Sequence, residues 1–304
     1  TDMHYFLFIF YNLLGVPFIF IGARIAALFN DKIARGLKGR RGLFEHLQQR
    51  LAALPPSRPR LWFHISSMGE FEQAKPVIQS VKSRRPDLAV IVTFFSPSGY
   101  ENSLRYPLAD VISYLPLDSW RNARRFVRAV NPFAMVIVRH DIWLNFQWRL
   151  HRQGIPSYLI DASMSSRRLR WIKRVRWAVR DVFRTFREIH VISADNIMPF
   201  RMLHPLPACI RVVGDTRYDQ VIARTRERDK IAPLLSSGLF ARQRCVVAGS
   251  TWPTDEKVIL PALIRWLHGH ADNRLIIVPH ELTPEHLQAL RDEFSQSGLD
   301  FVML

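Results

Sequence analysis

The sequence predicts an α/β protein with two doubly wound domains, the second incomplete, behind an N-terminal membrane-anchor helix. Three observations lead to this prediction. Residues 4–23 contain no Lys, Arg, Asp or Glu. After residue 60, short apolar segments alternate with segments of helical periodicity, the pattern of a parallel sheet covered on both faces. A length of 304 residues suits about two domains.

Composition and charge narrow the class of protein and the kind of partner. Hydrophobic residues make up 48% and charged residues 23% of the chain, which is typical of a globular protein. Cys209 and Cys245 alone cannot form a disulfide scaffold or a zinc finger, and they indicate a reducing compartment. The net charge of +17 predicts an anionic partner, which could be nucleic acid, an anionic membrane face or a phosphorylated substrate.

The apolar N-terminal run favours the membrane among these partners. About 20 apolar residues suffice to cross a bilayer as a helix, and the uncharged run reaches that length. A cleaved signal peptide fits poorly, because no cationic stretch precedes the run and no small-residue cleavage site follows it. The cations that follow place the rest of the chain on the cytoplasmic side: Lys32, Arg35, Lys38, Arg40 and Arg41. A helix lying in the membrane interface, or docked on the protein, remains an alternative to a spanning helix.

The first predicted domain covers residues 31–213 and follows an anchor of residues 1–30. Three prolines near residue 56 mark a break before its first strand. We expect strands at 61–66, 88–95, 111–115, 133–138, 157–161 and 188–193. We expect helices at 70–83, 119–130, 144–153 and 166–187.

The second predicted domain covers residues 214–304. Its expected elements are a strand at 244–249, a helix at 254–270, a strand at 274–278, a helix at 283–297 and a strand starting at 300–304. The chain ends there in the middle of the pattern, so we expect this domain to be incomplete.

The loop after the first strand carries a candidate general base. In open α/β sheets, ligands bind beyond the carboxyl ends of the strands. Gly69 in this loop allows a ligand to come close to the backbone. Glu70 falls at the start of a helix, where the dipole favours the ionised carboxylate, and an ionised carboxylate in a cleft can remove a proton. The alternative is a glutamate that only complements the helix dipole.

Two further loops follow predicted strands of the first domain. Ser96 or Ser98 could cap the helix after the second strand, and Ser98 would form a capping box with Glu101 as its N3 partner. That local role would explain these residues without a ligand.

The loop after the strand at 133–138 reads Arg139, His140, Asp141, Ile142 and Trp143. Three polar residues and a tryptophan directly after an apolar strand are typical of the wall of a ligand cleft. In the alternative interpretation, His140 and Asp141 form only a surface pair at the strand end.

The loop at 248–253 in the second domain is suited to a phosphate. Gly249, Ser250 and Thr251 offer backbone N–H groups at the start of a helix, where an anion is stabilised. The chain contains neither a Walker loop nor a G-x-G-x-x-G segment, so nothing supports a dinucleotide site of those kinds.

The segment 166–187 predicts a helix with an apolar stripe and a strongly basic remainder. The stripe consists of Ile172, Val175, Val179, Phe183 and Phe186. The basic residues are Arg167, Arg168, Arg170, Lys173, Arg174, Arg176, Arg180, Arg184 and Arg187. Arginine forms paired hydrogen bonds with phosphate, so we interpret this surface as one that faces lipid headgroups or a lipid phosphate. A solvated basic face is the alternative.

Together, these loops resemble the Kdo transferase family of Gram-negative bacteria. The matching segments are HISSMGEFEQAKPVI (64–78), TFFSPSGYE (93–101), ADVISYLPLDSWRNARRF (109–126), VGDTRYDQV (213–221) and AGSTWPTDE (248–256). The segment FNDKIARGLKGRRGLF (29–44) after the anchor is similar to the start of the family, especially to its Bacteroidetes-like branch. The resemblance runs in collinear order over nearly the whole chain.

The resemblance implies a GT-B fold, in which two Rossmann-like domains face a cleft, with no metal or other cofactor. It implies transfer of 3-deoxy-D-manno-octulosonic acid (Kdo) from CMP-Kdo to the lipid A precursor with inversion at the anomeric carbon. Glu70 takes the place of the family's general base. Asp141 stands where the family has a second acidic residue, a glutamate that is one methylene longer. The resemblance assigns acceptor binding to Ser66, Ser67, Gly69, Ser98, Arg139 and His140.

On the donor side, the resemblance assigns Gly249, Ser250, Thr251, Arg217 and His280. The family often has Pro-Arg-His where this chain has Pro279-His280-Glu281, so the arginine is missing. The chain stops before the family's glycine-rich segment, which predicts a C-terminally truncated form. The expected partners are CMP-Kdo, a phosphorylated lipid A precursor and anionic inner-membrane lipids at the cytoplasmic face, and not nucleic acid. Another membrane-bound GT-B enzyme with a different nucleotide sugar, or a non-catalytic membrane-surface module, is the alternative.

Overall fold

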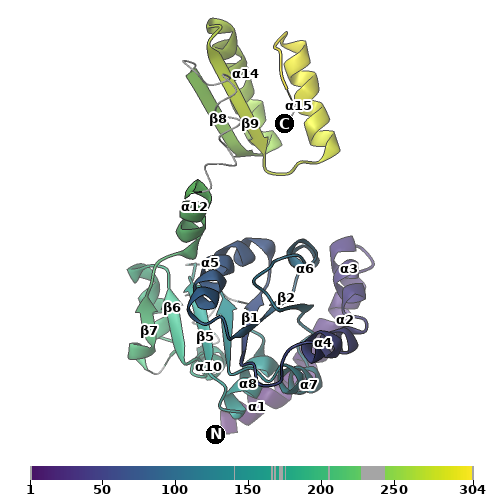
Figure 1. Cartoon of the computed structure of the whole chain (residues 1–304), viewed down its shortest axis with the longest axis vertical. Coiled ribbons are helices and arrows are strands. Elements are labelled where there is room, and N and C mark those ends of the chain that lie inside the picture. The colour runs from purple at the N-terminus through teal and green to yellow at the C-terminus, as the bar shows by residue number, and fades with distance from the viewer. Residues whose placement is uncertain are drawn as a thin grey trace. The chain divides into compact units, whose positions relative to one another are not determined.

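The structure is a computed structural model, and it describes residues 2–139, 141–165, 167, 169, 170, 174, 176–204, 206–226 and 244–302 (Figure 1). The chain divides into two compact units, Thr1–Ala223 and Arg224–Leu304. Helix α12 (Thr216–Arg226) begins in the first unit. The predicted domain boundary between residues 213 and 214 stays a prediction.

The first unit is built on a parallel sheet of seven strands in the order β3-β2-β1-β4-β5-β6-β7 (Figure 1). The strands are β1 (Arg60–Ile65), β2 (Ala89–Phe94), β3 (Val111–Tyr114), β4 (Ala134–Val138), β5 (Ser157–Ala162), β6 (Glu188–Val191) and β7 (Ile210–Val212). From β1 the chain winds outward to β3, then returns to β4 on the other side of β1 and winds outward again. The strand order therefore reverses between β1 and β4, and ligands bind at such a switch point in doubly wound folds.

Helices connect the strands of this sheet. They are α5 (Met68–Arg84), α6 (Pro97–Ser103), α7 (Trp120–Val130), α8 (Leu144–Arg152), α10 (Arg176–Phe183), the short η2 (Ala194–Asn196) and η3 (Pro207–Cys209), and α11 (Ile197–Arg201). Helix α12 follows the last strand, β7. Each of the parallel pairs needs such a crossover connection, because parallel strands cannot be joined by a tight turn.

Two apolar clusters fill the two faces of the sheet. Neighbouring residues of β1 point to opposite faces, so Trp62 packs with Phe126 and Phe146 on one face, and Phe63 lies in the cluster of Phe71 on the other. All five aromatic side chains are buried. Burial on both faces explains why these strands are continuously apolar in sequence.

The predicted α/β architecture and the six predicted strands of the first domain are confirmed. The predicted helix 166–187 is described over Arg176–Phe183 as α10, and most of its N-terminal half, with Ile172 and Val175, lies outside the described residues. It ends before Arg187, and Phe186 is buried beyond its last turn. The sequence analysis did not predict β7 or α12, because β7 is a three-residue edge strand and exposes two of its residues.

The second unit contains β8 (Arg244–Thr251), α14 (Pro253–Gly269), β9 (Asn273–Pro279) and α15 (Pro284–Gln296). The two strands are parallel, and Leu260, Leu290 and Phe294 form the buried apolar cluster. These four elements agree with the prediction. The strand expected from residue 300 is not formed over residues 300–302. A segment becomes a strand only by pairing with a neighbouring strand, which its own sequence does not supply.

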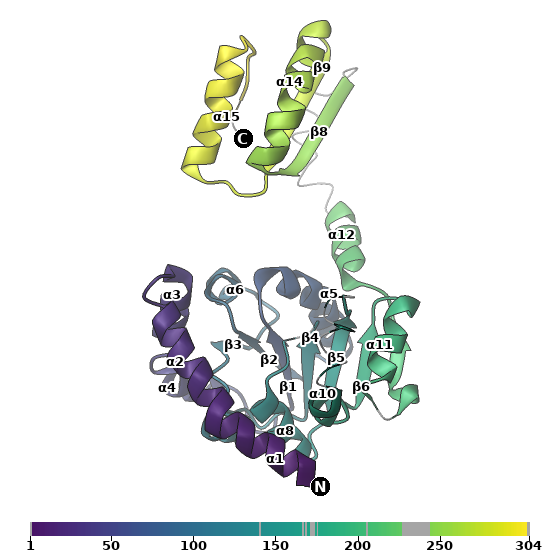
Figure 2. The ribbon, with the colours of Figure 1, turned by 180° about the vertical axis from the view of Figure 1, so that it is seen from behind.

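The N-terminal segment forms one continuous helix along a flank of the first unit (Figure 2). It consists of α1 (Asp2–Phe10), a π-helical stretch η1 (Tyr11–Gly15) and α2 (Val16–Ala26), and α3 (Asp31–Gly39) and α4 (Leu43–Ala52) follow it. Within the described residues, Tyr5–Ala26 is the one helix that is long and apolar enough to cross a membrane, with a mean hydropathy of 2.1. Length and composition alone do not separate a spanning helix from one that lies in the interface.

Replacing Gly99 by alanine is expected to lower the free energy of unfolding by about 1–3 kcal/mol, the range for overpacking a core. A β-carbon at Gly99 would lie 2.7 Å from Cδ1 of the buried Phe94 ring. Gly69→Ala is the matched control, because a β-carbon there meets no described atom within 4 Å. Chemical denaturation measures both variants. Equal stability of the Gly99 variant and the wild type would contradict the close packing described here.

Candidate active site

Glu70 is held at the carboxyl end of the central strand β1. Ser66 and Ser67 connect β1 to α5, and Glu70 is the third residue of that helix. Its Oε2 accepts hydrogen bonds from the backbone N–H groups of Ser66 at 2.8 Å and Ser67 at 3.1 Å. Among the described residues, no group donates a hydrogen bond to Oε1. One oxygen therefore fixes the side chain at the helix start, and the other can accept a proton.

Burial raises the pKa of Glu70 above its usual value, although the two backbone hydrogen bonds oppose the rise. The residue is 7% exposed. The negative charge of Asp141 adds to the increase. A base works best when its pKa lies near the working pH, so this increase suits proton abstraction.

Asp141 follows β4, on the other side of the switch point from Glu70. Its Oδ2 lies 3.1 Å from Nε2 of His64 and accepts a hydrogen bond from Nε1 of Trp143 at 3.2 Å. Burial acts to raise the pKa of Asp141, but hydrogen bonds from His64, Ser66 and Trp143 and the charge of His64 together lower it. The environment thus pushes the pKa values of two neighbouring carboxyl groups apart, which in enzymes separates an acid–base group from a permanently ionised one.

A series of hydrogen bonds from the strands β1 and β2 orients the carboxylate of Asp141. His64 is fully buried in β1, with Nδ1 at 3.0 Å from Oγ1 of Thr93 in β2. Trp62 donates its Nε1–H to the same Thr93 oxygen at 2.8 Å. An ionised carboxylate can only accept a hydrogen bond, so Nε2 of His64 carries a proton toward Asp141. His64 was not among the predicted site residues, although its place in a strand just before the Glu70 loop was a usable signal.

Two of the predicted acceptor-binding residues, Arg139 and Gly69, have features that suit a ligand site. Arg139 adopts a left-handed backbone with φ of 68°, a strained conformation that is concentrated at functional sites. Its Nε is buried and has no hydrogen-bond partner among the described residues. His140 lies outside the described residues. Gly69 leaves open space beside the Glu70 loop, since a β-carbon at this position would have no described atom within 4 Å.

The predicted cap at the second loop is confirmed for Ser96, and the capping box of Ser98 with Glu101 is wrong. Ser96, not Ser98, caps α6 by accepting a hydrogen bond from the N–H of Gly99 at 3.1 Å. The Ser98 hydroxyl lies 3.1 Å from that of Ser96. Glu101 forms an ion pair with Arg35 at 3.0 Å instead of returning to the helix start. The reason is tertiary, since α3 brings Arg35 to α6. Acceptor binding by Ser98 stays a prediction.

Arg40 supports the wall of the site from the α3–α4 connection. Its guanidinium donates hydrogen bonds to the carbonyl oxygens of Gly36, Phe95 and Leu115, and it lies 4.8 Å from the centre of the Phe95 ring. Burial lowers the pKa of Arg40 to about 10. Phe95 in turn packs against Trp143 with ring centres 4.8 Å apart. The sequence analysis had assigned this arginine only to the cationic cluster after the anchor.

Thr216 is bound to the carboxyl end of β5, at the same edge of the sheet as Glu70 and Asp141. Asp161 at the end of β5 has a left-handed φ of 51° and accepts hydrogen bonds from the backbone N–H of Thr216 at 3.1 Å and from its hydroxyl at 2.5 Å. Arg217 pairs with Asp215 at 2.5 Å. Asp161 was missed, because a single aspartate at the end of an apolar strand is a weak signal. Donor binding by Arg217 stays a prediction.

The loop of the second unit forms a small polar cluster. Ser250 has a left-handed φ of 61°, and its hydroxyl lies 2.7 Å from Nδ1 of His280. The His280 ring stacks on Trp252 with centres 4.4 Å apart. Thr251 donates its hydroxyl to the buried Glu256 at 2.6 Å. The structure thus brings together Ser250, Thr251 and His280, three of the predicted donor-side residues, next to Gly249.

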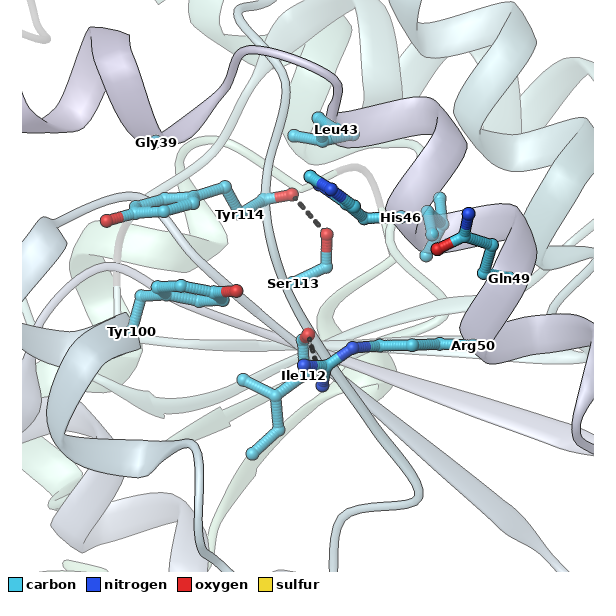
Figure 3. Close-up of a pocket in the computed structure, with 10 residues that line it drawn as sticks. Gly39, Leu43, His46, Gln49, Arg50, Tyr100, Ile112, Ser113 and Tyr114 are labelled. Carbon is cyan, nitrogen blue, oxygen red and sulfur yellow. Dashed lines mark hydrogen bonds between the residues drawn. The ribbon is translucent and has the colours of Figure 1, made fainter.

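A separate cavity of about 350 Å³ lies between α4 and the edge strand β3 (Figure 3). The Tyr100 and Tyr114 rings stack at one side of it with centres 4.1 Å apart, and Arg50 donates to the carbonyl oxygen of Ile112 at 3.4 Å. It contains neither Glu70 nor Asp141. Helix α4 covers the edge strand here, which protects it from pairing with another chain.

Comparison with known proteins decides the family. The profile of the 3-deoxy-D-manno-octulosonic-acid transferase (kdotransferase) family matches residues 41–220. The chain belongs to this family. The match includes the Glu70 loop, Asp141 and the Thr216 segment. Arg40 and the cluster around Ser250 and His280 lie outside the matched residues. Within the described residues, no group of three or more His, Cys, Asp or Glu side chains could hold a metal ion.

Curated relatives have similar sequences over much of the chain. A probable mitochondrial 3-deoxy-D-manno-octulosonic acid transferase of Arabidopsis thaliana is 27% identical over 259 residues, 81% of this chain and 56% of the relative. The 3-deoxy-D-manno-octulosonic acid transferase of Haemophilus influenzae is 24% identical over 83% of this chain and 58% of the relative. That of Chlamydophila psittaci is 27% identical over 69% of this chain and 49% of the relative. The chain spans about half the length of these relatives.

Solved structures confirm the fold that the resemblance implied. The UDP-GlcNAc 2-epimerase of Neisseria meningitidis, bound to UDP-GlcNAc, aligns with a TM-score of 0.57 at 13% identity, covering 78% of this chain and 69% of the other. The UDP-GlcNAc 2-epimerase of Methanocaldococcus jannaschii aligns with a TM-score of 0.54 at 12% identity, covering 77% and 68%. These likenesses support the α/β fold of GT-B type and carry no further information on activity.

Proposed function

We propose that the protein transfers Kdo from CMP-Kdo to a phosphorylated lipid A precursor at the cytoplasmic face of the inner membrane. The observation that carries the proposal is the buried carboxylate of Glu70 beside the half-buried carboxylate of Asp141 at the switch point of the sheet, in a chain of the Kdo transferase family. The long apolar helix and the net charge of +17 support a membrane location and an anionic acceptor.

In the proposed reaction, Oε1 of Glu70 removes the proton from an acceptor sugar hydroxyl. The hydroxyl oxygen attacks the anomeric carbon of Kdo from the side opposite the phosphate, so the configuration inverts. The bond between that carbon and the phosphate oxygen breaks, and CMP leaves with the bonding electrons. No metal is required in this scheme, because the leaving phosphate can be stabilised by hydrogen-bond donors.

Two further groups fit the substrates of this reaction. The unpartnered Nε–H of Arg139, two residues before Asp141 in the chain, is a buried donor and suits an anionic part of the acceptor. In the second unit, the loop of Gly249, Ser250 and Thr251 presents backbone N–H groups ahead of α14, where a phosphate of the donor would be stabilised.

A transfer assay with radiolabelled CMP-Kdo and a lipid A precursor, using the full-length protein, tests this function. We expect labelled Kdo to appear in the lipid fraction and CMP to inhibit the reaction. Inhibition by UDP and not CMP would show that the protein uses another nucleotide sugar. Binding to liposomes without any transfer would favour a non-catalytic membrane module.

Replacing His280 by alanine is expected to weaken the binding of CMP about tenfold, which corresponds to about 1.4 kcal/mol. The variant loses the contact that holds Ser250 in its left-handed conformation and the stacking partner of Trp252. Titration calorimetry with CMP on the full-length protein measures the effect. His268→Ala is the control, because this exposed residue lies at the opposite end of α14 from the Ser250 loop, where it contacts the carbonyl oxygen of Ser297 after α15. Equal affinity of the His280 variant and the wild type would remove His280 from the donor site.

A further inference from the structure

Three arginines converge beside the N-terminal helix. Arg124 of α7 and Arg149 and Arg152 of α8 line a pocket of about 280 Å³ together with Phe8 of α1 and Trp120. Asn145 and Trp148 complete its lining. This pocket contains none of the residues assigned above to the donor or the acceptor.

The positive charges of this pocket lack a counter-ion within the protein. No acidic side chain among the described residues forms an ion pair with any of the three arginines. The Nε of Arg149 is buried and has no hydrogen-bond partner in the described part of the chain. Burial, and after it the charges of Arg124 and Arg152, lower the pKa of Arg149, so the three guanidinium groups repel one another. An anion in the pocket would relieve this repulsion.

Polar side chains in the middle of the N-terminal helix form hydrogen bonds with the rest of the first unit. Tyr11 donates its hydroxyl to Oδ2 of Asp118 at 2.8 Å, and Asn12 donates to Oδ1 of Asn145 at 2.9 Å. Both acceptors are buried. Trp148 packs against Phe8 and Tyr11, with ring centres 5.7 and 6.0 Å away. The helix is therefore fastened along α8 at its midpoint (Figures 1 and 2).

The opposite face of the helix is apolar and exposed. Its exposed large side chains are Tyr5, Phe6, Ile9, Phe10, Leu13, Leu14, Phe18, Ile21 and Ile25. The covered positions recur about every four residues from residue 7 to residue 20. A spacing of four residues is slightly longer than the 3.6 residues of an α-helical turn, so the covered positions would drift around a regular α-helix. The π-helical stretch η1 has more residues per turn and offsets part of this drift, so the same face of the helix stays against the protein.

This arrangement conflicts with a helix that spans the bilayer. A spanning helix would carry α7 and α8, with their arginines, into the hydrocarbon layer beside its midpoint. Charged side chains are costly there. A helix that lies in the plane of the interface instead puts its apolar face into the lipid and leaves the docked face on the protein.

We propose that Arg124, Arg149 and Arg152 bind the headgroup phosphate of an anionic phospholipid, beside an N-terminal helix that lies in the plane of the membrane. This inference rests on the membrane location in the proposed function but not on its chemistry. Arginine suits the ligand because its planar fork matches phosphate oxygens. Trp120 at the rim is of the type enriched at the membrane interface.

Sedimentation with vesicles tests the phosphate site. The double variant Arg149→Gln/Arg152→Gln is expected to bind vesicles containing phosphatidylglycerol about twenty-five-fold more weakly, since each arginine near an anionic surface contributes roughly fivefold. Arg121→Gln/Arg128→Gln is the matched control, because it removes the same charge from exposed positions of α7 outside the pocket. We expect less than about a fivefold loss for this control. Equal losses for the two double variants, with unchanged thermal unfolding, would overturn the site.

Cysteine labelling tests the orientation of the helix. In a full-length protein with Cys209 and Cys245 replaced by serine, single cysteines at Asp2 and Asn30 flank the helix. We expect an impermeant maleimide to label both in inverted membrane vesicles and neither in right-side-out vesicles. Labelling on opposite sides would overturn the in-plane orientation while leaving membrane attachment intact. Failure to sediment with any vesicle would overturn the membrane location in the proposed function as well.

Discussion

Replacing Glu70 by glutamine is expected to lower kcat for Kdo transfer about a thousandfold, within the range that general bases contribute. Glutamine keeps an oxygen that can accept the hydrogen bonds from the N–H groups of Ser66 and Ser67. It cannot accept the acceptor's proton at neutral pH. The fold and membrane binding should therefore persist, and only the chemical step should fail. Transfer assays and thermal unfolding of the full-length protein measure both.

The matched control for this variant is Glu45→Gln. Glu45 also lies in the first turn of a helix, α4, but it is exposed. If Glu70 only complemented a helix dipole, the two variants would behave alike. Near-native transfer by the Glu70 variant would remove it from the mechanism.

The pH profile of the wild type gives a second measure of the role of Glu70. Its ionised form is the reactive one, so kcat/KM should fall as the pH drops through the pKa of this group. Because burial raises that pKa, the fall should begin above the pH at which an ordinary glutamate is protonated. In the Glu70→Gln variant, the residual kcat/KM should no longer show this fall at low pH.

Replacing Asp141 by asparagine is expected to lower kcat about a hundredfold and to shift the acid limb toward lower pH. The shift follows because the charge of Asp141 contributes to the raised pKa of Glu70, and asparagine removes that charge. In the asparagine variant, Nε2–H of His64 and Nε1–H of Trp143 lose a charged hydrogen-bond acceptor. These hydrogen bonds become weaker, so the side chains at position 141 and of Trp143 are held less firmly and the rate falls. If Asp141 had only a structural role, its replacement would leave the pH at which kcat/KM falls on the acid side unchanged.

The matched control is Asp87→Asn, which removes a surface carboxylate that pairs with Arg85. Its pH profile and rate should equal those of the wild type. A wild-type pH limb in the Asp141 variant would contradict the electrostatic coupling of the two carboxylates.

Much of the fold could be predicted because the strands of a parallel sheet are buried on both faces. Segments such as Ala89–Phe94 are then apolar at nearly every position and stand out from their surroundings. The edge strand β7 lacks that signal, since Arg211 and Val212 are exposed. The strand expected at residue 300 was wrong over 300–302, because apolar sequence does not supply a pairing neighbour.

The candidate site could be predicted only where the chain itself carries the pattern. Glu70 follows a strand and opens a helix, and both signals are local. Arg40 was assigned to the cationic cluster, but tertiary packing places it, half-buried, over the rings of Phe95 and Tyr114. The pairing of Glu101 with Arg35 likewise depends on α3 meeting α6.

The sequence by itself determined the order of strands and helices, the position of the loops that follow the strands and the presence of a long apolar helix, because these depend on neighbours along the chain. Only the tertiary structure decided that His64 contacts Asp141, that Thr216 donates hydrogen bonds to Asp161, and that Tyr11 and Asn12 bind the apolar helix to Asp118 and Asn145. Those contacts join residues between 55 and 133 positions apart. Their pairing depends on which strands lie side by side and on which buried polar groups must find a partner.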